Sequence, residues 1–185
     1  WVNQATAWIP VDWWDVKCNK RIDYDLLPKT VCGAGLDMAQ KIDLAAFSIV
    51  FKIPLFNRPE EVVEIVATDV KDGEEESEAL ARKSISLNFE IAILPFFWIP
   101  ENTMREREKD DNIPYSLWVD EGLITATEGD AIDYEVIYKD ITQKILPRFP
   151  LLKEANIGYD PAFATDIAQR LTKKGLTTVE IPQNY

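Results

Sequence analysis

The order of strand-like and helix-like segments is the feature that most limits the folds open to this chain. Three strand-like runs come first, at residues 31–37, 44–53 and 85–98. Helix-like and strand-like segments then alternate to the end of the sequence. Helices are expected at 101–111, 115–121, 134–146 and 161–174, and the other strands at 123–127, 155–159 and 177–181. This order predicts an α/β domain.

Residues at the ends of these segments support the assignment. Asp133 is suited to cap the helix that follows it, and apolar residues recur along one face of that helix between 136 and 145. Pro161 suits the first turn of the last helix, and Gly175 suits its C-terminal end.

Two stretches differ from the rest of the chain. Residues 1–30 hold four of the six tryptophans and are predicted to be a linker or docking arm. The alternative is an N-terminal segment that packs on its own domain. Residues 57–88 are predicted to be an acidic insertion within a hairpin, since 57–83 carry nine acidic against four basic residues. Because the chain begins at Trp1, it is expected to be a fragment or processed product rather than an intact translation product.

The composition excludes several kinds of chemistry. The 185 residues include no histidine, which rules out Ser-His-Asp and Cys-His catalysis and His-based zinc sites. For the two cysteines, Cys18 and Cys32, a disulfide and reduced thiols are both open, and reduced thiols are favoured. No apolar run approaches the roughly 20 residues of a membrane span, so no membrane partner is expected.

The charge balance points to carboxylate chemistry. Acidic residues number 32 against 20 basic ones, which gives a net charge of −12. Such a chain can hold Mg²⁺ or Mn²⁺ through carboxylates, or use paired carboxylates on glycosides. The same charge opposes non-specific binding to phosphates.

Two aspartates are the strongest site candidates. Asp37 ends the first predicted strand and Asp160 ends the strand at 155–159. If these strands are parallel neighbours, both carboxylates meet in the crevice at the strand ends, where two metal ions could act on a phosphodiester. Asp160 as a helix cap and Asp37 as a turn residue remain alternatives. Asp43 is either a turn residue or a further carboxylate at the site, and Asp166 is expected to be a solvated helix residue.

Several motifs then resemble, in order and spacing, the nuclease domain of phage terminase large subunits. The segments that carry the resemblance are Gly35–Ala46, Leu94–Glu101, Ile113–Trp118, Gly122–Thr125, Gly129–Tyr134 and Ile157–Pro161. The stretch from Ala7 to Trp14 is similar to the linker that leads out of that family's ATPase domain. Residues 38–41, Met-Ala-Gln-Lys, depart from the family, which favours hydroxyl side chains there.

The resemblance implies an RNase H-like nuclease domain at residues 31–185, a mixed sheet flanked by helices that is incomplete at its C-terminus. It implies a two-metal endonuclease that cleaves concatemeric double-stranded DNA during packaging. Asp37 would bridge the Mg²⁺ or Mn²⁺ ions, Asp160 would be the second ligand, and Asp43 is a further metal candidate. The implied partners are DNA, the small terminase subunit and the portal protein, in the cytoplasm of an infected or lysogenic bacterium.

Other functions remain open at this point. One is a non-catalytic RNase H-like interaction module, such as a truncated prophage remnant that docks on the portal or the small terminase. Another is a glycosidase that uses paired carboxylates. Six basic residues form either a DNA-binding patch or ordinary helix-surface charges, with the second interpretation favoured: Lys139, Lys144, Arg148, Arg170, Lys173 and Lys174.

Overall fold

The computed structural model describes residues 21–39, 44–54, 75, 89–111 and 113–182. The strands in this part of the chain are β1 (Cys32–Asp37), β2 (Ala45–Pro54), β3 (Phe89–Pro100), β4 (Thr125–Thr127), β5 (Asn156–Tyr159) and β6 (Thr177–Glu180). The helices are α3 (Glu101–Asp111), α4 (Tyr115–Asp120), α5 (Tyr134–Lys139), α6 (Leu146–Arg148) and α7 (Pro161–Lys173). A π-helical turn, η3 (Asp140–Ile145), joins α5 to α6, and short 3₁₀ turns lie at η1 (Leu27–Lys29) and η4 (Pro150–Lys153).

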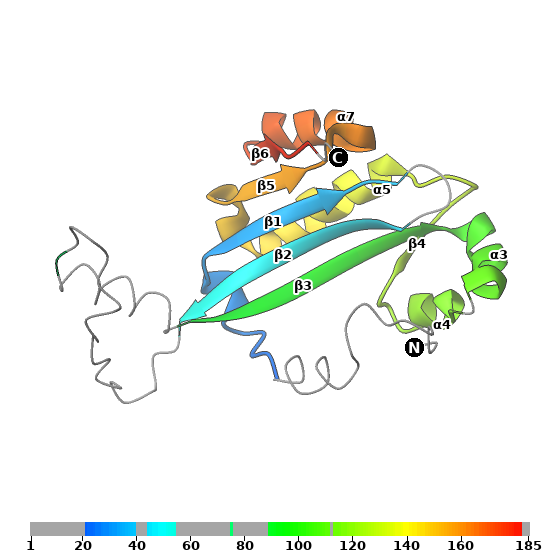
Figure 1. Ribbon diagram of the computed structural model, residues 1–185, viewed down its shortest axis with the longest axis horizontal. Coiled ribbons are helices and arrows are strands. Elements are labelled where there is room, and N and C mark those ends of the chain that lie inside the picture. The colour runs from blue at the N-terminus through cyan, green and yellow to red at the C-terminus, as the bar shows by residue number, and fades with distance from the viewer. Residues whose placement is uncertain (1–20, 40–43, 55–74, 76–88, 112, 183–185) are drawn as a thin grey trace.

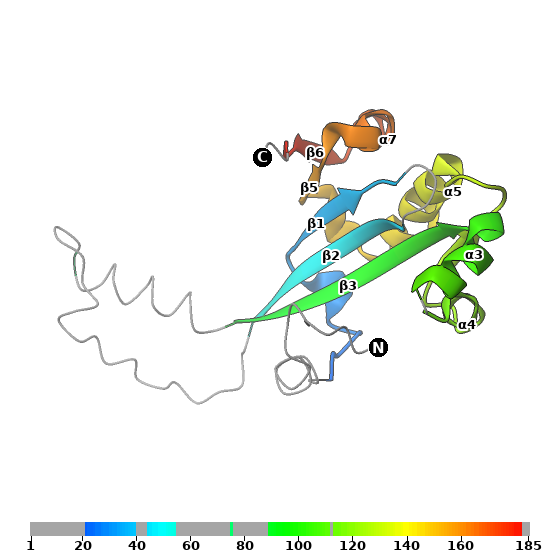
Figure 2. The same cartoon turned by 45° about the vertical axis from the view of Figure 1, so that its right-hand side comes forward.

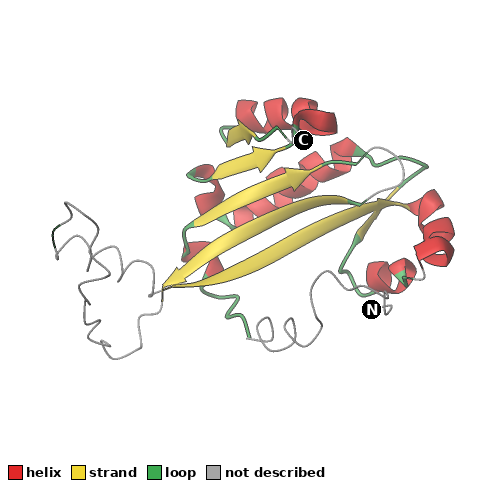
Figure 3. Ribbon diagram, viewed as in Figure 1, coloured by secondary structure: helices red, strands yellow, loops and turns green. Residues whose placement is uncertain are grey.

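The described strands form one mixed sheet in the order β4-β3-β2-β1-β5-β6 (Figures 1 and 3). β2 pairs antiparallel with both β1 and β3. β5 runs parallel to β1, β6 to β5, and β4 to β3. Parallel neighbours need long connections, and α7 provides the one between β5 and β6. The predicted class, α/β with a mixed sheet flanked by helices, is confirmed.

One face of the sheet is covered by helices because side chains alternate along each strand. In β2, Phe47, Ile49 and Phe51 have no exposed surface, and they share one apolar cluster with Ile137 of α5 and Ile141 of η3. Figures 1 and 2 show α5 and its continuation lying across β1 and β2. Burying one such side chain contributes about 1.5–3 kcal/mol, so this cluster holds the central strands firmly in place.

The opposite face carries exposed apolar side chains on its central strands. Val50, Ile91 and Ile93 are 38%, 55% and 57% exposed, respectively. Each of them alternates with a side chain that points toward the helices. The described sheet is therefore packed by helices on one side.

The helices α3 and α4 form a separate lobe at the end of β3 (Figure 1). Its buried cluster consists of Ile99, Met104, Tyr115 and Ile124. Glu108 of α3 accepts hydrogen bonds from the backbone N–H of Ser116 (2.6 Å) and from its Oγ–H (2.8 Å). Because the first N–H groups of a helix lack partners within the helix, Glu108 acts as a cap for α4.

This cap makes the α3–α4 contact sensitive to acid. The Ser116 N–H, the Ser116 hydroxyl and nearby Arg105 lower the pKa of Glu108 below its ordinary 4.5. Because this pKa is lowered, the Glu108 carboxylate contributes fully to stability above pH 4.5, and this contribution is lost as the pH falls through the lowered pKa. We expect the hydrogen-exchange protection factor of the Ser116 amide, measured by NMR, to drop in that acid range. In Glu108→Gln the protection factor of the Ser116 amide should be lower at neutral pH and should not change in this acid range. An identical pH profile in both proteins would contradict the role of Glu108 as the cap.

The last helix differs from its prediction at its start. Ala162 (φ −61°, ψ 114°) and Phe163 (φ 66°, ψ −17°) are not helical, so Pro161 does not lie in a regular first helical turn. These angles are those of the two central residues of a type II turn, after which the regular helix begins. At the other end Gly175 has φ 92°, which confirms the predicted C-terminal glycine.

Some predictions fall outside the described residues. These are the arm before residue 21, most of the acidic insertion at 57–88, Cys18 and Asp43. Within the described part Leu27 is buried in the main cluster, so the end of the predicted arm packs on the domain. Cys32 is a free thiol whose pKa is raised by burial. No helix among the described residues has the length and apolar character needed to cross a bilayer.

Candidate active site

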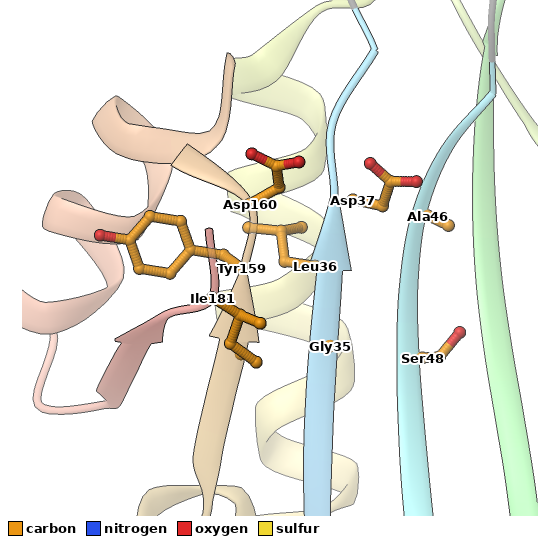
Figure 4. Close-up of a pocket in the computed structure, with 9 residues that line it drawn as sticks. Gly35, Leu36, Asp37, Ala46, Ser48, Tyr159, Asp160 and Ile181 are labelled. Atoms are coloured by element: carbon orange, nitrogen blue, oxygen red, sulfur yellow. The ribbon is translucent and has the colours of Figure 1, made fainter. Parts of the chain in front are cut away.

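The pairing of β1 with β5 brings the two candidate aspartates to the same edge of the sheet. Leu36 pairs with Tyr159 in parallel register, and Asp37 and Asp160 are the next residues along the two strands. Neighbouring strands lie about 4.8 Å apart. Figure 4 shows both carboxylates extending past the ends of their strands. The structure therefore brings the two predicted residues together, while their metal-binding and catalytic roles stay predictions.

A pocket of about 400 Å³ opens beside the two carboxylates. Small residues of three adjacent strands line it on the face opposite to α5: Gly35, Ala46, Ser48 and Gly158. Ile181, which follows β6, forms a side wall (Figure 4). Its backbone N–H donates to the carbonyl of Tyr159 at 2.8 Å. A Cβ on Gly158 would lie 2.5 Å from Cδ1 of Ile181, so the glycine allows Ile181 to close over β5.

Asp160 also serves as the cap of the turn that leads into α7. Its Oδ1 accepts a hydrogen bond from the N–H of Ala162 at 2.9 Å. The capping interpretation is therefore correct for one carboxylate oxygen, and Oδ2 makes no hydrogen bond within the described part of the chain. The cap orients the carboxylate, since it ties Asp160 to the turn that follows.

Tyr134 fixes the backbone just beyond Asp37. Its hydroxyl donates to the carbonyl oxygen of Ala39 at 3.1 Å. Met38, which lies between Asp37 and Ala39 in the sequence, is 4% exposed. Partial burial raises the pKa of Tyr134 above its ordinary value of 10.0. Sequence reasoning missed this residue, because 95 positions separate the two partners and no local pattern links them.

The donor set at this edge suits a hard divalent cation. Carboxylate oxygens are the ligands that Mg²⁺ and Mn²⁺ prefer. Asp37 and Asp160 supply two such groups, although the described residues contain no cluster of three or more His, Cys, Asp or Glu side chains. The third predicted carboxylate, Asp43, lies outside the described residues.

Asp133 lies at the start of α5 and Asp166 lies within α7, outside the pocket beside Asp37. Asp133 caps α5, since its Oδ1 accepts the N–H of Glu135 at 2.8 Å, and this prediction is confirmed. Asp166 is exposed on α7, where its charge acts on Arg170. Neither of them lines the pocket beside Asp37.

Several basic residues of the suggested DNA-binding patch are paired within the domain. Arg170 of α7 bonds Glu135 of α5 at 2.6 Å and lies 4.0 Å from the ring centroid of Tyr138. The hydrogen bond to Glu135 raises the pKa of Arg170. Lys139 and Lys144 pair with acids four residues before them on the same helical segment. These contacts favour the interpretation as helix-surface charges.

Comparison with known proteins supplies a second line of evidence. No family model matches the chain. A stretch of 53 residues, 29% of the chain, is 45% identical to the terminase large subunit of Enterobacteria phage HK97 and covers 10% of that protein. An alignment 100 residues long, which covers 51% of the chain, is 32% identical to Protein YmfN of Escherichia coli K12 and covers 21% of that protein.

The fold matches a solved structure as well. The crystal structure of the HK97 large terminase superposes with a TM-score of 0.55 and 26% sequence identity. The match covers 84% of this chain and 25% of the terminase chain. The matched regions thus span a quarter or less of each relative. The sequence and the fold agree, and the chain is related to part of the phage terminase large subunits.

Proposed function

We propose that this chain is the metal-dependent endonuclease domain of a phage terminase large subunit, with an RNase H-like fold, and that it cleaves concatemeric double-stranded DNA during packaging. The observation that carries the proposal is the meeting of Asp37 and Asp160 at the ends of two parallel strands. Open α/β sheets bind ligands at this edge. The relationship to terminases favours a nuclease over a glycosidase.

Each residue of the candidate site has a role in the proposed cleavage. Asp37 and Asp160 would hold the divalent cations, and Oδ2 of Asp160 is the oxygen left for this role because Oδ1 accepts the hydrogen bond from the Ala162 N–H. When bound, Mg²⁺ or Mn²⁺ would supply an activated water and stabilise the charge on the leaving oxygen. The open pocket beside the acids receives the sugar-phosphate strand, and Tyr134 keeps the backbone after Asp37 in place. Asp43 is proposed as a further metal ligand.

The implied partners follow from the same proposal. DNA is the substrate, and the small terminase subunit and the portal protein are the proposed assembly partners, in the cytoplasm of an infected or lysogenic bacterium. The second candidate is a non-catalytic RNase H-like module that docks on those partners. The lack of a third acidic ligand among the described residues favours this alternative.

Plasmid nicking distinguishes the two. We expect the purified chain to convert supercoiled plasmid to the open circle with Mn²⁺ or Mg²⁺, and to lose this activity in EDTA. Mn²⁺ binding, measured by calorimetry, should accompany the activity. Nicking that persists in EDTA would contradict a metal mechanism, and the absence of nicking with every metal would favour the interaction module.

A further inference from the structure

We propose that Phe163 contacts the DNA substrate by stacking its ring on a nucleobase close to the candidate cleavage site. This inference rests on the proposed nuclease function, and it adds a substrate-positioning residue to the two carboxylates. Phe163 lies in the turn between Asp160 and the regular part of α7.

The backbone at Phe163 adopts a conformation that a bulky residue rarely takes. With φ 66°, it is the only non-glycine residue of the described ranges with a positive φ. The third residue of a type II turn requires this conformation and favours glycine. A phenylalanine held there stores backbone strain, and such strain concentrates at ligand contacts and active sites.

Packing does not account for the phenylalanine. The residue is 51% exposed. The buried face of α7 is formed instead by Ala164, Ile167, Ala168 and Leu171. Much of the ring's apolar surface is therefore available to a partner.

The proposed nuclease function makes DNA the partner, and Phe163 lies close to Asp160 in the chain. The residues are three apart, so their Cα atoms lie within about 11 Å of each other, which is roughly three nucleotide steps along a DNA strand. The hydrogen bond from the Ala162 N–H to Asp160 Oδ1 links the carboxylate to the turn that contains Phe163. A strand whose phosphate reaches Asp160 therefore brings its neighbouring bases within reach of the ring.

Stacking also suits the charge of this chain. A net charge of −12 works against affinity through phosphate contacts. An aromatic ring needs no positive charge to contact a base. At a single-stranded end it stacks on the open base face, and within a duplex it inserts between two base steps, at a cost of a few kcal/mol for unstacking. An exposed ring beside the acids adds affinity where the electrostatics do not.

The test compares three substitutions by fluorescence anisotropy, with a labelled DNA duplex that carries single-stranded ends, at low salt. Phe163→Gly should weaken binding about tenfold, which corresponds to the loss of one base–aromatic stack. Phe163→Tyr should bind like the unmodified chain, and Phe163→Leu should fall between the two. The melting temperature of Phe163→Gly should not fall, because glycine adopts the turn without strain.

The outcomes separate this inference from the nuclease proposal. Unchanged affinity in Phe163→Gly, or no DNA binding by the unmodified chain, overturns the stacking role, while cleavage is judged separately from the Asp37 variant. If Phe163→Leu binds DNA as tightly as Phe163→Tyr, and Phe163→Gly has a lower melting temperature, Phe163 has a structural role and the inference is also overturned. The ranking tyrosine above leucine above glycine in affinity, with glycine no less stable, supports it.

Discussion

Asp37→Asn is expected to slow metal-dependent plasmid nicking by about 10³-fold or more, because losing this proposed metal ligand would remove several kcal/mol of transition-state stabilisation. Asparagine has nearly the same shape as aspartate and no charge. Asp37 is exposed at the end of β1, and its backbone pairing with Ala46 does not depend on the carboxylate. The fold should therefore survive. The measurement is the initial rate of loss of supercoiled plasmid with saturating Mn²⁺.

Substitutions at Asp160 and Asp166 provide the matched controls. Asp160→Asn should abolish nicking yet keep its melting temperature, because asparagine caps a helix start as well as aspartate. Asp160→Ala should lose activity and also about 1 kcal/mol of stability through the missing cap. Asp166→Asn, on the exposed face of α7, should nick at the original rate. An Asp37→Asn protein with full activity would remove Asp37 from the mechanism.

The features that sequence predicted well are those with local causes. The strand expected at 44–53 is β2 (Ala45–Pro54), where the alternation that places Phe47, Ile49 and Phe51 on the buried face is local in the sequence. Asp133 and Gly175 stand at helix ends, where backbone geometry demands their residue types. The meeting of Asp37 and Asp160 required one assumption beyond this, that their strands are parallel neighbours, and the sheet confirms it.

The features that sequence missed depend on tertiary contacts. The bond from Tyr134 to Ala39 exists because α5 crosses the end of β1. The π-helical turn at Asp140–Ile145 interrupts a helix that was predicted to run unbroken from 134 to 146. The positive φ of Phe163 also had no signal, since its turn lacks the glycine that would mark it. In each case a neighbour distant in sequence, or a strained backbone, decides the local structure.

Asp140→Ala is expected to lower the free energy of unfolding by about 2–3 kcal/mol, because it leaves a buried hydrogen-bond donor without its acceptor. Trp98 of β3 is 1% exposed, and its Nε1–H donates to Oδ2 of Asp140 at 2.9 Å. Asp140 is itself 7% exposed at the start of the π-helical turn. The melting temperature should fall by about 5–10 °C for a domain of this size. Thermal and urea unfolding measure both quantities.

The same carboxylate pairs with Lys144, which provides the control. The Lys144 side chain is 75% exposed and that of Asp140 only 9%, so this is not a simple surface ion pair. Lys144→Ala should still cost less than Asp140→Ala, because the carboxylate keeps its hydrogen bond from Trp98. Asp140→Asn keeps an acceptor oxygen for the indole and should fall between the two. Equal losses for Asp140→Ala and Lys144→Ala would show that the ion pair, and not the bond to Trp98, carries the effect. Trp98 pairs with Ala45 of β2 and Thr125 of β4, so it lies within the sheet. If Asp140→Ala is the most destabilising of the three variants, the hydrogen bond from Trp98 to the π-helical turn is one of the contacts that hold the sheet against its helices.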